Sequence, residues 1–201
     1  WSSDVCLSDL DAYTRHKQYK KPKSYNPTYV RSLRELLQAD LCYFYNQGRR
    51  NDGYNFILVV IDCFSRKLFV EPIKKKTSGA VFEALQKLIE EKIGKFDKLA
   101  VDGGKEWWNE RVRALCEKNN VRLFMPRTSG KAVVVERAIS TLKNLLSRYM
   151  TLEKTAKFIP ALQKIVDGYN NRYHRGIQTT PNAIEYNSEA RMALAGRLQA
   201  L

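Results

Sequence analysis

Apolar residues recur along this chain at two spacings, one typical of β-strands and the other of α-helices. Five segments either alternate apolar and polar residues or run apolar without a break, and they cover residues 36–45, 54–64, 67–73, 96–102 and 121–125. Four segments carry apolar residues at helical spacing, over residues 78–94, 109–119, 130–150 and 156–174. A short helix is also predicted near residues 28–36. The main elements therefore follow the order β-β-β-α-β-α-β-α-α.

This order predicts the fold class. The first three strands are joined by short connections, such as the turn at Ser65-Arg66, and are expected to form an antiparallel meander. The later strands alternate with helices, which is typical of parallel strands joined by crossover connections. Gly94 and Asn109 support two helix boundaries, as a terminating glycine and an N-cap. We therefore predict an α/β, ribonuclease H-like fold with a five-stranded mixed sheet flanked by helices.

Three carboxylates occupy positions that the local pattern does not explain. Asp40 lies in the middle of the first strand, where Asp is disfavoured, on the same face as Gln38. Asp102 ends the fourth strand, and open α/β sheets form ligand sites at the carboxyl ends of parallel strands. Glu136 lies in the first turn of the long helix that follows the fifth strand. Because the first and fourth strands are neighbours in this fold, we expect the three side chains to converge.

Converging carboxylates repel one another unless a cation neutralises them. Mg²⁺ prefers oxygen ligands, and two ions about 3.5–4 Å apart can hold the attacking and leaving oxygens of a phosphoryl displacement. We therefore predict that Asp40, Asp102 and Glu136 are catalytic residues and metal ligands. Each acid alone also has a simpler interpretation: a satisfied strand residue, a turn residue before Gly-Gly, or a favourable charge at a helix N-terminus.

Other residues whose side chains could take part in catalysis or metal binding are interpreted as structural. Asp62 also ends an apolar strand, but its position beside the Ser65-Arg66 turn favours hydrogen bonds that hold the hairpin. The four cysteines, at positions 6, 42, 63 and 116, form no Cys-x-x-Cys pair, and the two histidines lie far apart in sequence. We interpret the cysteines as reduced packing residues rather than zinc ligands.

The charge balance indicates a partner. Thirty-five Lys and Arg residues against 21 Asp and Glu give a formal net charge of +14, which favours binding to nucleic acid.

We divide the chain into a basic N-terminal arm (1–35), a core (36–186) and a C-terminal extension (187–201). No apolar run reaches the roughly 18 residues that a membrane span needs. The chain begins at Trp1 without a secretory signal, so we expect a fragment of a longer intracellular protein.

Five stretches then occur in a familiar order: "QADL", "VVIDCFSRKLFVEPI", "VDGGKEWWN", "KAVVVERAISTLKN" and "YNNRYHRGIQTTP". Together they resemble the catalytic core of retroviral-type integrases, the Asp,Asp,Glu recombinases, over residues 36–185. The sequence is most similar to the integrases of Maverick/Polinton DNA transposons and related retroelements. Two departures stand out: 33 residues separate Asp102 from Glu136 where the family usually has 35, and the family's zinc domain and C-terminal DNA-binding module are not recognisable.

The resemblance implies a divalent-metal-dependent DNA integrase core, a polynucleotidyl transferase and nuclease. It implies 3′-end processing and strand transfer of element DNA into target DNA, with two Mg²⁺ or Mn²⁺ ions as cofactors. The implied partners are double-stranded DNA, as element ends and target, and further copies of the chain in a homodimer or higher oligomer. No membrane or small-molecule substrate is implied, and the expected location is nuclear or virion-associated.

The resemblance also implies DNA contacts. The position of Lys143 matches a family lysine that contacts DNA ends, and Lys131, Arg127 and Lys105 flank the proposed site, where they can neutralise phosphates. Two alternatives stay open: a ribonuclease H-like nuclease of other specificity, and a host-adapted, non-catalytic DNA-binding protein.

Overall fold

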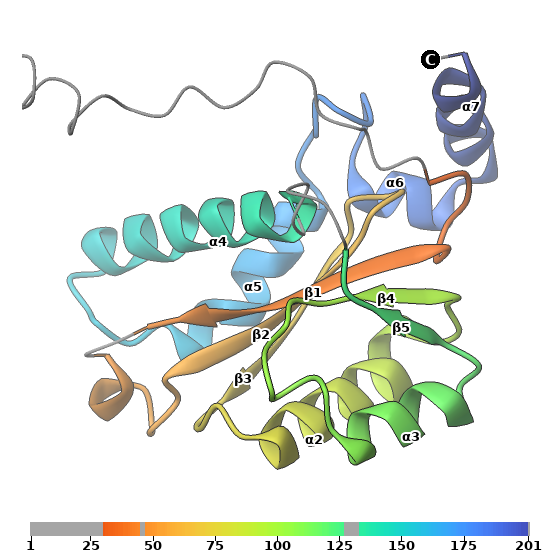
Figure 1. Cartoon of the computed structure of the whole chain (residues 1–201). Coiled ribbons are helices and arrows are strands. Elements are labelled where there is room, and N and C mark those ends of the chain that lie inside the picture. The colour runs from red at the N-terminus through yellow and green to blue at the C-terminus, as the bar shows by residue number, and fades with distance from the viewer. Residues whose placement is uncertain (1–29, 45–46, 127–132, 201) are drawn as a thin grey trace, which may run out of the picture.

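A five-stranded mixed sheet lies at the centre of the fold, with its strands in the order β3-β2-β1-β4-β5 (Figure 1). The computed structural model describes residues 30–44, 47–126 and 133–200. The strands are β1 (Leu36–Tyr43), β2 (Phe56–Asp62), β3 (Leu68–Ile73), β4 (Lys98–Ala100) and β5 (Arg122–Phe124). The first three pair antiparallel, whereas β4 runs parallel to β1 and β5 runs parallel to β4. The predicted sheet is confirmed, including the contact between the first and fourth strands.

Helices cover both faces of this sheet (Figure 1). One face carries α2 (Ser78–Leu88), its π-helical continuation η2 (Ile89–Ile93) and α3 (Glu110–Lys118), and the other carries α4 (Val133–Leu152) and α5 (Ile159–Asn170). A short 3-10 helix, η1 (Gly48–Arg50), precedes β2. The predicted boundary signals are confirmed: Asn109 caps α3 by accepting a hydrogen bond from the N–H of Val112, and Gly94 ends η2 with φ of 74°, a conformation that favours glycine.

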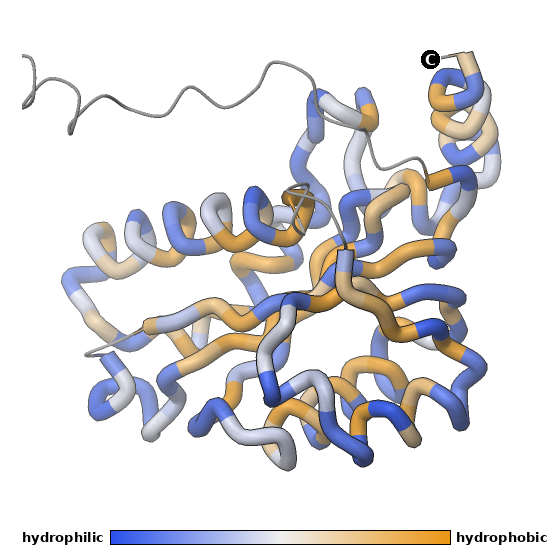
Figure 2. The backbone as a smooth tube through the Cα atoms, viewed as in Figure 1, coloured by the Kyte–Doolittle hydropathy of each residue, from blue (hydrophilic) through white to orange (hydrophobic). Residues whose placement is uncertain are grey.

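The alternation predicted for the first strand separates two apolar cores. Leu37 and Leu41 pack with α2 and α3, while Cys42 and Phe44 pack with α4 and α5 on the opposite face. Figure 2 shows the same division along α4, whose apolar positions face the sheet and whose polar positions face outward. Asp40, whose side chain alternates with its neighbours in the same way, therefore lies on the α4 side of the sheet.

Two helices near the C-terminus were not predicted. They are α6 (Pro181–Tyr186) and α7 (Ser188–Gln199), and Leu194 of α7 packs in a third apolar cluster with Val30 and Leu36. The described part of the predicted helix 28–36 is also different, because residues 30–35 form a turn before β1 begins. The helix predicted over 156–174 is shorter, since α5 ends at Asn170.

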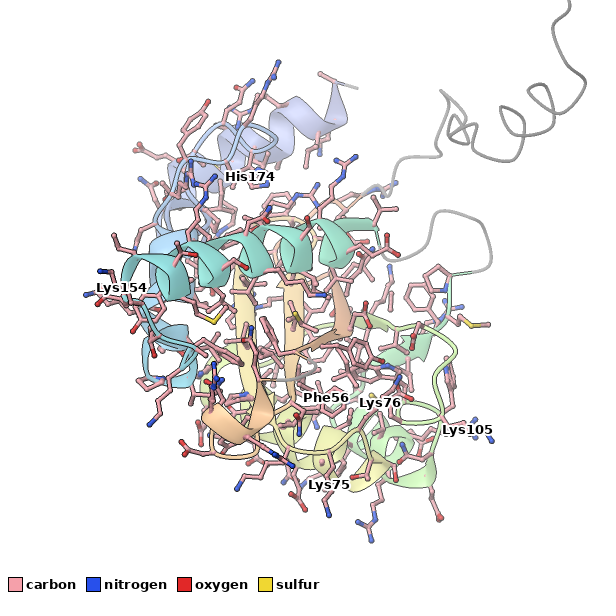
Figure 3. The ribbon with its side chains drawn as sticks, turned by 90° about the vertical axis from the view of Figure 1, so that its left-hand side faces the viewer. Phe56, Lys75, Lys76, Lys105, Lys154 and His174 are labelled. Carbon is pink, nitrogen blue, oxygen red and sulfur yellow. The ribbon has the colours of Figure 1, made fainter. Side chains whose placement is uncertain are left out.

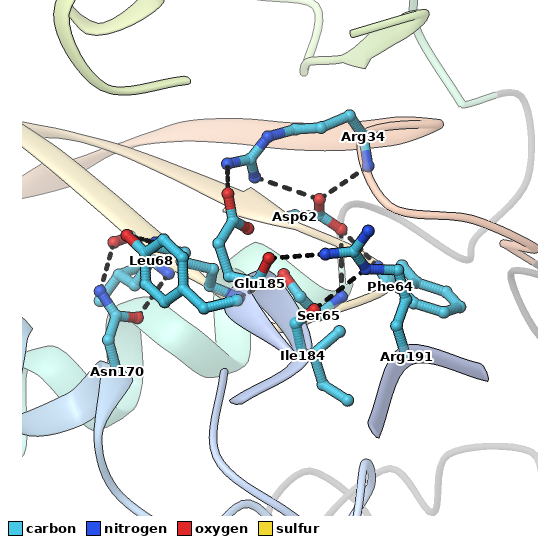
Figure 4. Close-up of polar contacts among 11 residues, drawn as sticks. Arg34, Asp62, Phe64, Ser65, Leu68, Asn170, Ile184, Glu185 and Arg191 are labelled. Atoms are coloured by element: carbon cyan, nitrogen blue, oxygen red, sulfur yellow. Dashed lines mark hydrogen bonds and ion pairs between the residues drawn. The ribbon is translucent and has the colours of Figure 1, made fainter. Parts of the chain in front are cut away.

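The interpretation of Asp62 as a structural carboxylate is confirmed (Figure 4). Its fully buried carboxylate accepts hydrogen bonds from the N–H groups of Phe64 and Ser65, which shape the turn after β2. It also accepts from the N–H and guanidinium of Arg34, and the same guanidinium reaches Glu185 of α6 at 2.7 Å. Asp62 therefore ties the hairpin to the segment before β1 and, through Arg34, to α6.

The described cysteines also follow the prediction. Cys42, Cys63 and Cys116 are free and buried, whereas Cys6 lies outside the described residues. Burial raises the pKa of the Cys42 and Cys63 thiols to about 12, so both are packing residues without nucleophilic character at neutral pH. Within the described ranges, no helix combines the length and the apolar character that crossing a membrane requires.

Candidate active site

Asp40 lies in β1, whereas Asp102 lies two residues beyond the end of the neighbouring parallel strand β4 and not, as predicted, at the end of the strand, because β4 is shorter than expected. The Cα of Gln38 in β1 is paired with that of Ala100 at the end of β4, and each aspartate follows two residues later. Asp40 is half-buried, and its Oδ1 accepts a 2.7 Å hydrogen bond from the N–H of Leu41. Asp102 is exposed, and its Oδ1 accepts a 3.0 Å hydrogen bond from the N–H of Gly104. Both aspartates therefore lie close to the carboxyl end of β4.

The start of α4 is attached to β1 by a buried glutamine. The side-chain oxygen of Gln38 accepts hydrogen bonds from the N–H groups of Val134 and Val135, each at 3.1 Å. These are N–H groups of the first turn, which have no partner within the helix. Glu136 is the next residue, and Asp40 lies two residues beyond Gln38 on the same strand face. The bond thus seats the beginning of α4 over the carboxylate-bearing part of β1.

The three carboxylates share one electrostatic environment. Burial raises the pKa of Asp40, the Leu41 N–H lowers it, and the negative charges of Asp102 and Glu136 raise it further. Asp40 is therefore close enough to both acids to be affected by them. Within the described parts of the chain, however, no three His, Cys, Asp or Glu side chains form a group that could hold a metal ion.

The donor set still fits a hard divalent cation. Carboxylate oxygens are the ligands that Mg²⁺ prefers, and Asp102 and Glu136 are exposed, so their side chains can turn without disturbing the core. The mutual repulsion felt at Asp40 is the electrostatic condition that a bound cation would relieve. The roles of Asp40, Asp102 and Glu136 as catalytic residues and metal ligands stay a prediction.

A lysine that sequence reasoning missed lies beside these acids. Lys76 forms a 2.7 Å ion pair with buried Glu106 and donates a hydrogen bond to the hydroxyl of Tyr43. The Glu106 bond, followed by the Tyr43 bond, raises the pKa of Lys76, and its positive charge lowers the pKa of Asp40. Figure 3 labels Lys76 on the side of α4 opposite to His174. Its only sequence signal is membership of the run Lys74-Lys75-Lys76, which is typical of a solvated surface.

The structure describes two of the four residues that are predicted to contact DNA. Lys143 is exposed on α4, in the same stripe as Glu136. Burial raises the pKa of the Cys42 thiol on β1, and the positive charge of Lys143 lowers it. Lys105 is exposed in the loop after Asp102 (Figure 3). Lys131 and Arg127 lie outside the described residues. A role in DNA binding stays a prediction for all four.

The loop after β4 is held in place by two tryptophans. Trp107 is fully buried, and Trp108 donates a 2.7 Å hydrogen bond from its indole Nε1 to the backbone oxygen of Asp102. The guanidinium of Arg113 lies over the Trp108 ring. These contacts fix the backbone from which the Asp102 carboxylate projects.

Comparisons with known proteins agree with this fold. A sequence family described as "Integrase core domain" matches residues 33–129. A putative uncharacterized transposon-derived protein of Caenorhabditis elegans is 43% identical over 136 residues, which make up 67% of this chain and 47% of that protein. The Pro-Pol polyprotein of feline foamy virus is 25% identical over 152 residues, which make up 73% of this chain and 13% of the polyprotein. The chain thus spans less than half the length of these relatives.

Solved structures share the fold. The integrase catalytic core domain of HTLV-2, solved in complex with magnesium, superposes with a TM-score of 0.65 at 21% identity, covering 77% of this chain and 98% of that one. The catalytic core domain of BIV integrase gives a TM-score of 0.62 at 22% identity, covering 80% and 99%. The predicted ribonuclease H-like fold is therefore confirmed. The narrower resemblance to Maverick/Polinton integrases stays a prediction.

Proposed function

We propose that this chain, which belongs to the retroviral-type integrase core family, processes the 3′ ends of element DNA and joins them to target DNA. Membership of the family supports DNA integration in general terms, and the individual steps are our proposal. The observation that supports it is the attachment of α4 to Gln38, because this contact joins the strand that carries Asp40 to the start of the helix that carries Glu136.

In this proposal the three acids hold two Mg²⁺ or Mn²⁺ ions. Such ions, when bound, help to activate a water or a 3′-hydroxyl and stabilise the charge on the leaving oxygen of an in-line displacement. Asp40 must be ionised to serve as a ligand, and burial opposes this. Lys76 favours the ionised form of Asp40 and is itself held by Glu106 and Tyr43. Lys76 is therefore a positioning residue in the proposed mechanism.

DNA binding is assigned to basic residues around these acids. Lys143 projects from the same stripe of α4 as Glu136, so it is suited to contact the phosphates of an element end held at the carboxylates. Lys105 follows Asp102 by three residues and is suited to contact the DNA backbone on the other side of the carboxylates. Arg127 and Lys131 flank the site in sequence and complete the proposed set.

The partners and location follow from the reaction. Two DNA ends must be held together while they are joined to a target, so we propose a homodimer or higher oligomer acting on double-stranded DNA. The reaction needs no membrane and no small-molecule substrate. A nuclear or virion-associated location is proposed because both element and target DNA must be reached.

A strand-joining assay with matched variants tests the proposal. Labelled oligonucleotide ends and a branched DNA that mimics the joined product are each incubated with Mg²⁺; the branched DNA reports the reverse reaction. Wild type is compared with Asp102→Asn and with Asp97→Asn, an exposed aspartate just before β4. We expect Asp102→Asn to lose more than about 100-fold of the activity, since even outer-shell changes at metal sites cost about 10–100-fold. Asp97→Asn should retain it.

Three results would overturn the proposal. Equal activity of wild type and Asp102→Asn would remove the metal site from the reaction. Cleavage of RNA–DNA hybrids without any joining or reversal on branched DNA would indicate a nuclease of other specificity. DNA binding without any Mg²⁺-dependent chemistry would indicate a non-catalytic DNA-binding protein.

A further inference from the structure

A pocket of about 450 Å³ lies on the flank of α4 that faces away from the carboxylates. It is bounded by α4, by the end of α5 with the chain that follows, and by the turn between β2 and β3. Four arginines line it, Arg66, Arg137, Arg172 and Arg175, and we call it the arginine pocket. Its volume falls in the range of about 300–1,000 Å³ that is typical of small-ligand sites.

No acidic side chain among the described residues forms an ion pair with the arginines of this pocket. Its lining includes no Asp or Glu, and the ion pairs formed among the described residues use Arg34 and lysines instead of these four arginines. Arg66 lines the pocket together with Tyr169 and His174, and its positive charge acts on the pKa of both residues. Four guanidinium groups around one cavity without a carboxylate favour an anionic ligand.

Other groups in the pocket suit a nucleotide. The Nδ1 atom of His174 accepts a 3.1 Å hydrogen bond from the N–H of Gly176, so the neutral ring carries its proton on Nε2, as a donor. Tyr173 is 63% exposed, and Tyr169 lines the interior. Aromatic rings beside a basic groove form the combination that binds nucleic-acid strands, with bases stacking on the rings and phosphates meeting the cations.

The pocket is separate from the proposed catalytic site. The α4 residues that line it, among them Val134, Arg137 and Thr141, form a different stripe of the helix from Glu136 and Lys143. Figure 3 shows the two sides: His174 lies on one side of α4, and Lys76 and Lys105 lie on the other. A phosphate held in the pocket is therefore separated from the carboxylates by α4.

We propose that the arginine pocket binds a backbone phosphate of a DNA strand outside the reacting strand, with Tyr173 available to a neighbouring base. Arginine matches phosphate through its planar, bidentate donors, and the strongly basic chain favours nucleic acid over an acidic peptide. The inference goes beyond the proposed function, because it concerns binding on the far flank of α4 and needs neither metal nor catalysis.

Equilibrium binding of a fluorescent DNA duplex with a single-stranded flank tests this inference. The full chain carrying Asp102→Asn is used in EDTA, so that no chemistry takes place and a failed strand-joining assay has no bearing on the result. The pocket variant adds Arg172→Gln and Arg175→Gln. The control adds Lys118→Gln and Arg122→Gln instead. These substitutions remove the same amount of positive charge from two exposed basic residues, one in α3 and one in β5.

We expect the pocket variant to weaken DNA binding at least about 10-fold and to lower the slope of log Kd against log salt by about 1, because the one phosphate held in the pocket is no longer neutralised. The control should change Kd by less than about 2-fold. Equal weakening in both variants would overturn the inference, since only overall charge would then matter, and so would unchanged binding by the pocket variant. Tighter, pocket-dependent binding of a labelled polyglutamate peptide would also overturn it, in favour of an acidic protein partner.

Discussion

The side-chain oxygen of Gln38 accepts a 3.1 Å hydrogen bond from the backbone N–H of Val135, which joins the central strand β1 to the first turn of α4. The same oxygen accepts from Val134, and the glutamine is buried. This contact links the strand that carries Asp40 to the helix that carries Glu136. The relative position of these two acids therefore depends on a residue that has no charge and no direct role in the proposed chemistry.

Replacing Gln38 by Leu should reduce both the stability of the fold and the proposed strand-joining activity. The variant leaves two helix N–H groups without their partner, and each unpaired group costs about 1–3 kcal/mol when it is buried. We expect a lower free energy of unfolding and a large loss of strand joining, because the start of α4 is no longer held over β1. Urea unfolding and the joining assay measure the two effects. Gln163→Leu, at an exposed position of α5, is the control and should leave both nearly unchanged.

Lys76→Gln should change the pH dependence of the reaction. The ammonium of Lys76 lowers the pKa of Asp40, so its removal raises that pKa and leaves more Asp40 protonated at a given acidic pH. We expect the acidic limb of the pH–rate profile to move to higher pH. Lys76→Arg, which keeps the charge, should restore the limb, and Lys75→Gln, an exposed neighbour, should not move it. An unmoved limb in Lys76→Gln would exclude the positioning role.

Asp40→Asn should stabilise the metal-free protein near neutral pH. Burial and the charges of Asp102 and Glu136 raise the pKa of Asp40 in the folded state, so the folded protein binds this proton more readily than the unfolded chain. Stability from this group is therefore present at low pH and falls as pH rises through the folded-state pKa. The difference from wild type should vanish near about pH 3, below the ordinary aspartate range.

The same variant tests the metal ligand. A cation that binds only the folded state stabilises it by mass action. Addition of Mg²⁺ should therefore raise the Tm of the wild type and of Asp97→Asn, but not that of Asp40→Asn. A Mg²⁺-dependent rise of the same size in Asp40→Asn would remove Asp40 from the ligand set.

Asp62→Ala should destabilise the fold through a different mechanism. The change leaves Arg34, whose side chain is 12% exposed, without one of its two carboxylate partners, and it removes the acceptor for the N–H groups of the turn. Breaking a buried ion pair by removing one partner costs about 3–5 kcal/mol. Chemical denaturation measures this destabilisation, with Asp97→Ala as a control that should change stability by less than about 0.5 kcal/mol. A small effect would mean that water replaces the carboxylate.

The sequence by itself determined the order of the main elements and the faces of the central strand. Alternation in β1 separated Leu37 and Leu41 from Cys42 and Phe44, and the structure has the same division. The helical spacing predicted over residues 130–150 is confirmed in α4, where Val135, Ala138, Leu142 and Leu146 are buried. Asp62 was also interpreted correctly, because its partners at Phe64 and Ser65 are close in sequence. These features depend on short-range periodicity and turn chemistry, which a single sequence contains.

Only the tertiary structure decided the contacts between distant segments. The pairing of Lys76 with Glu106, the bond from Gln38 to the start of α4 and the meeting of Arg66 with Arg172 and Arg175 join elements that are far apart in the chain. Helix α7 was missed for a related reason: its apolar residues form no clear stripe, and Leu194 becomes a core residue only by packing beside Val30. Side-chain identity limits which contacts are possible, but the packing of whole elements selects which of them form.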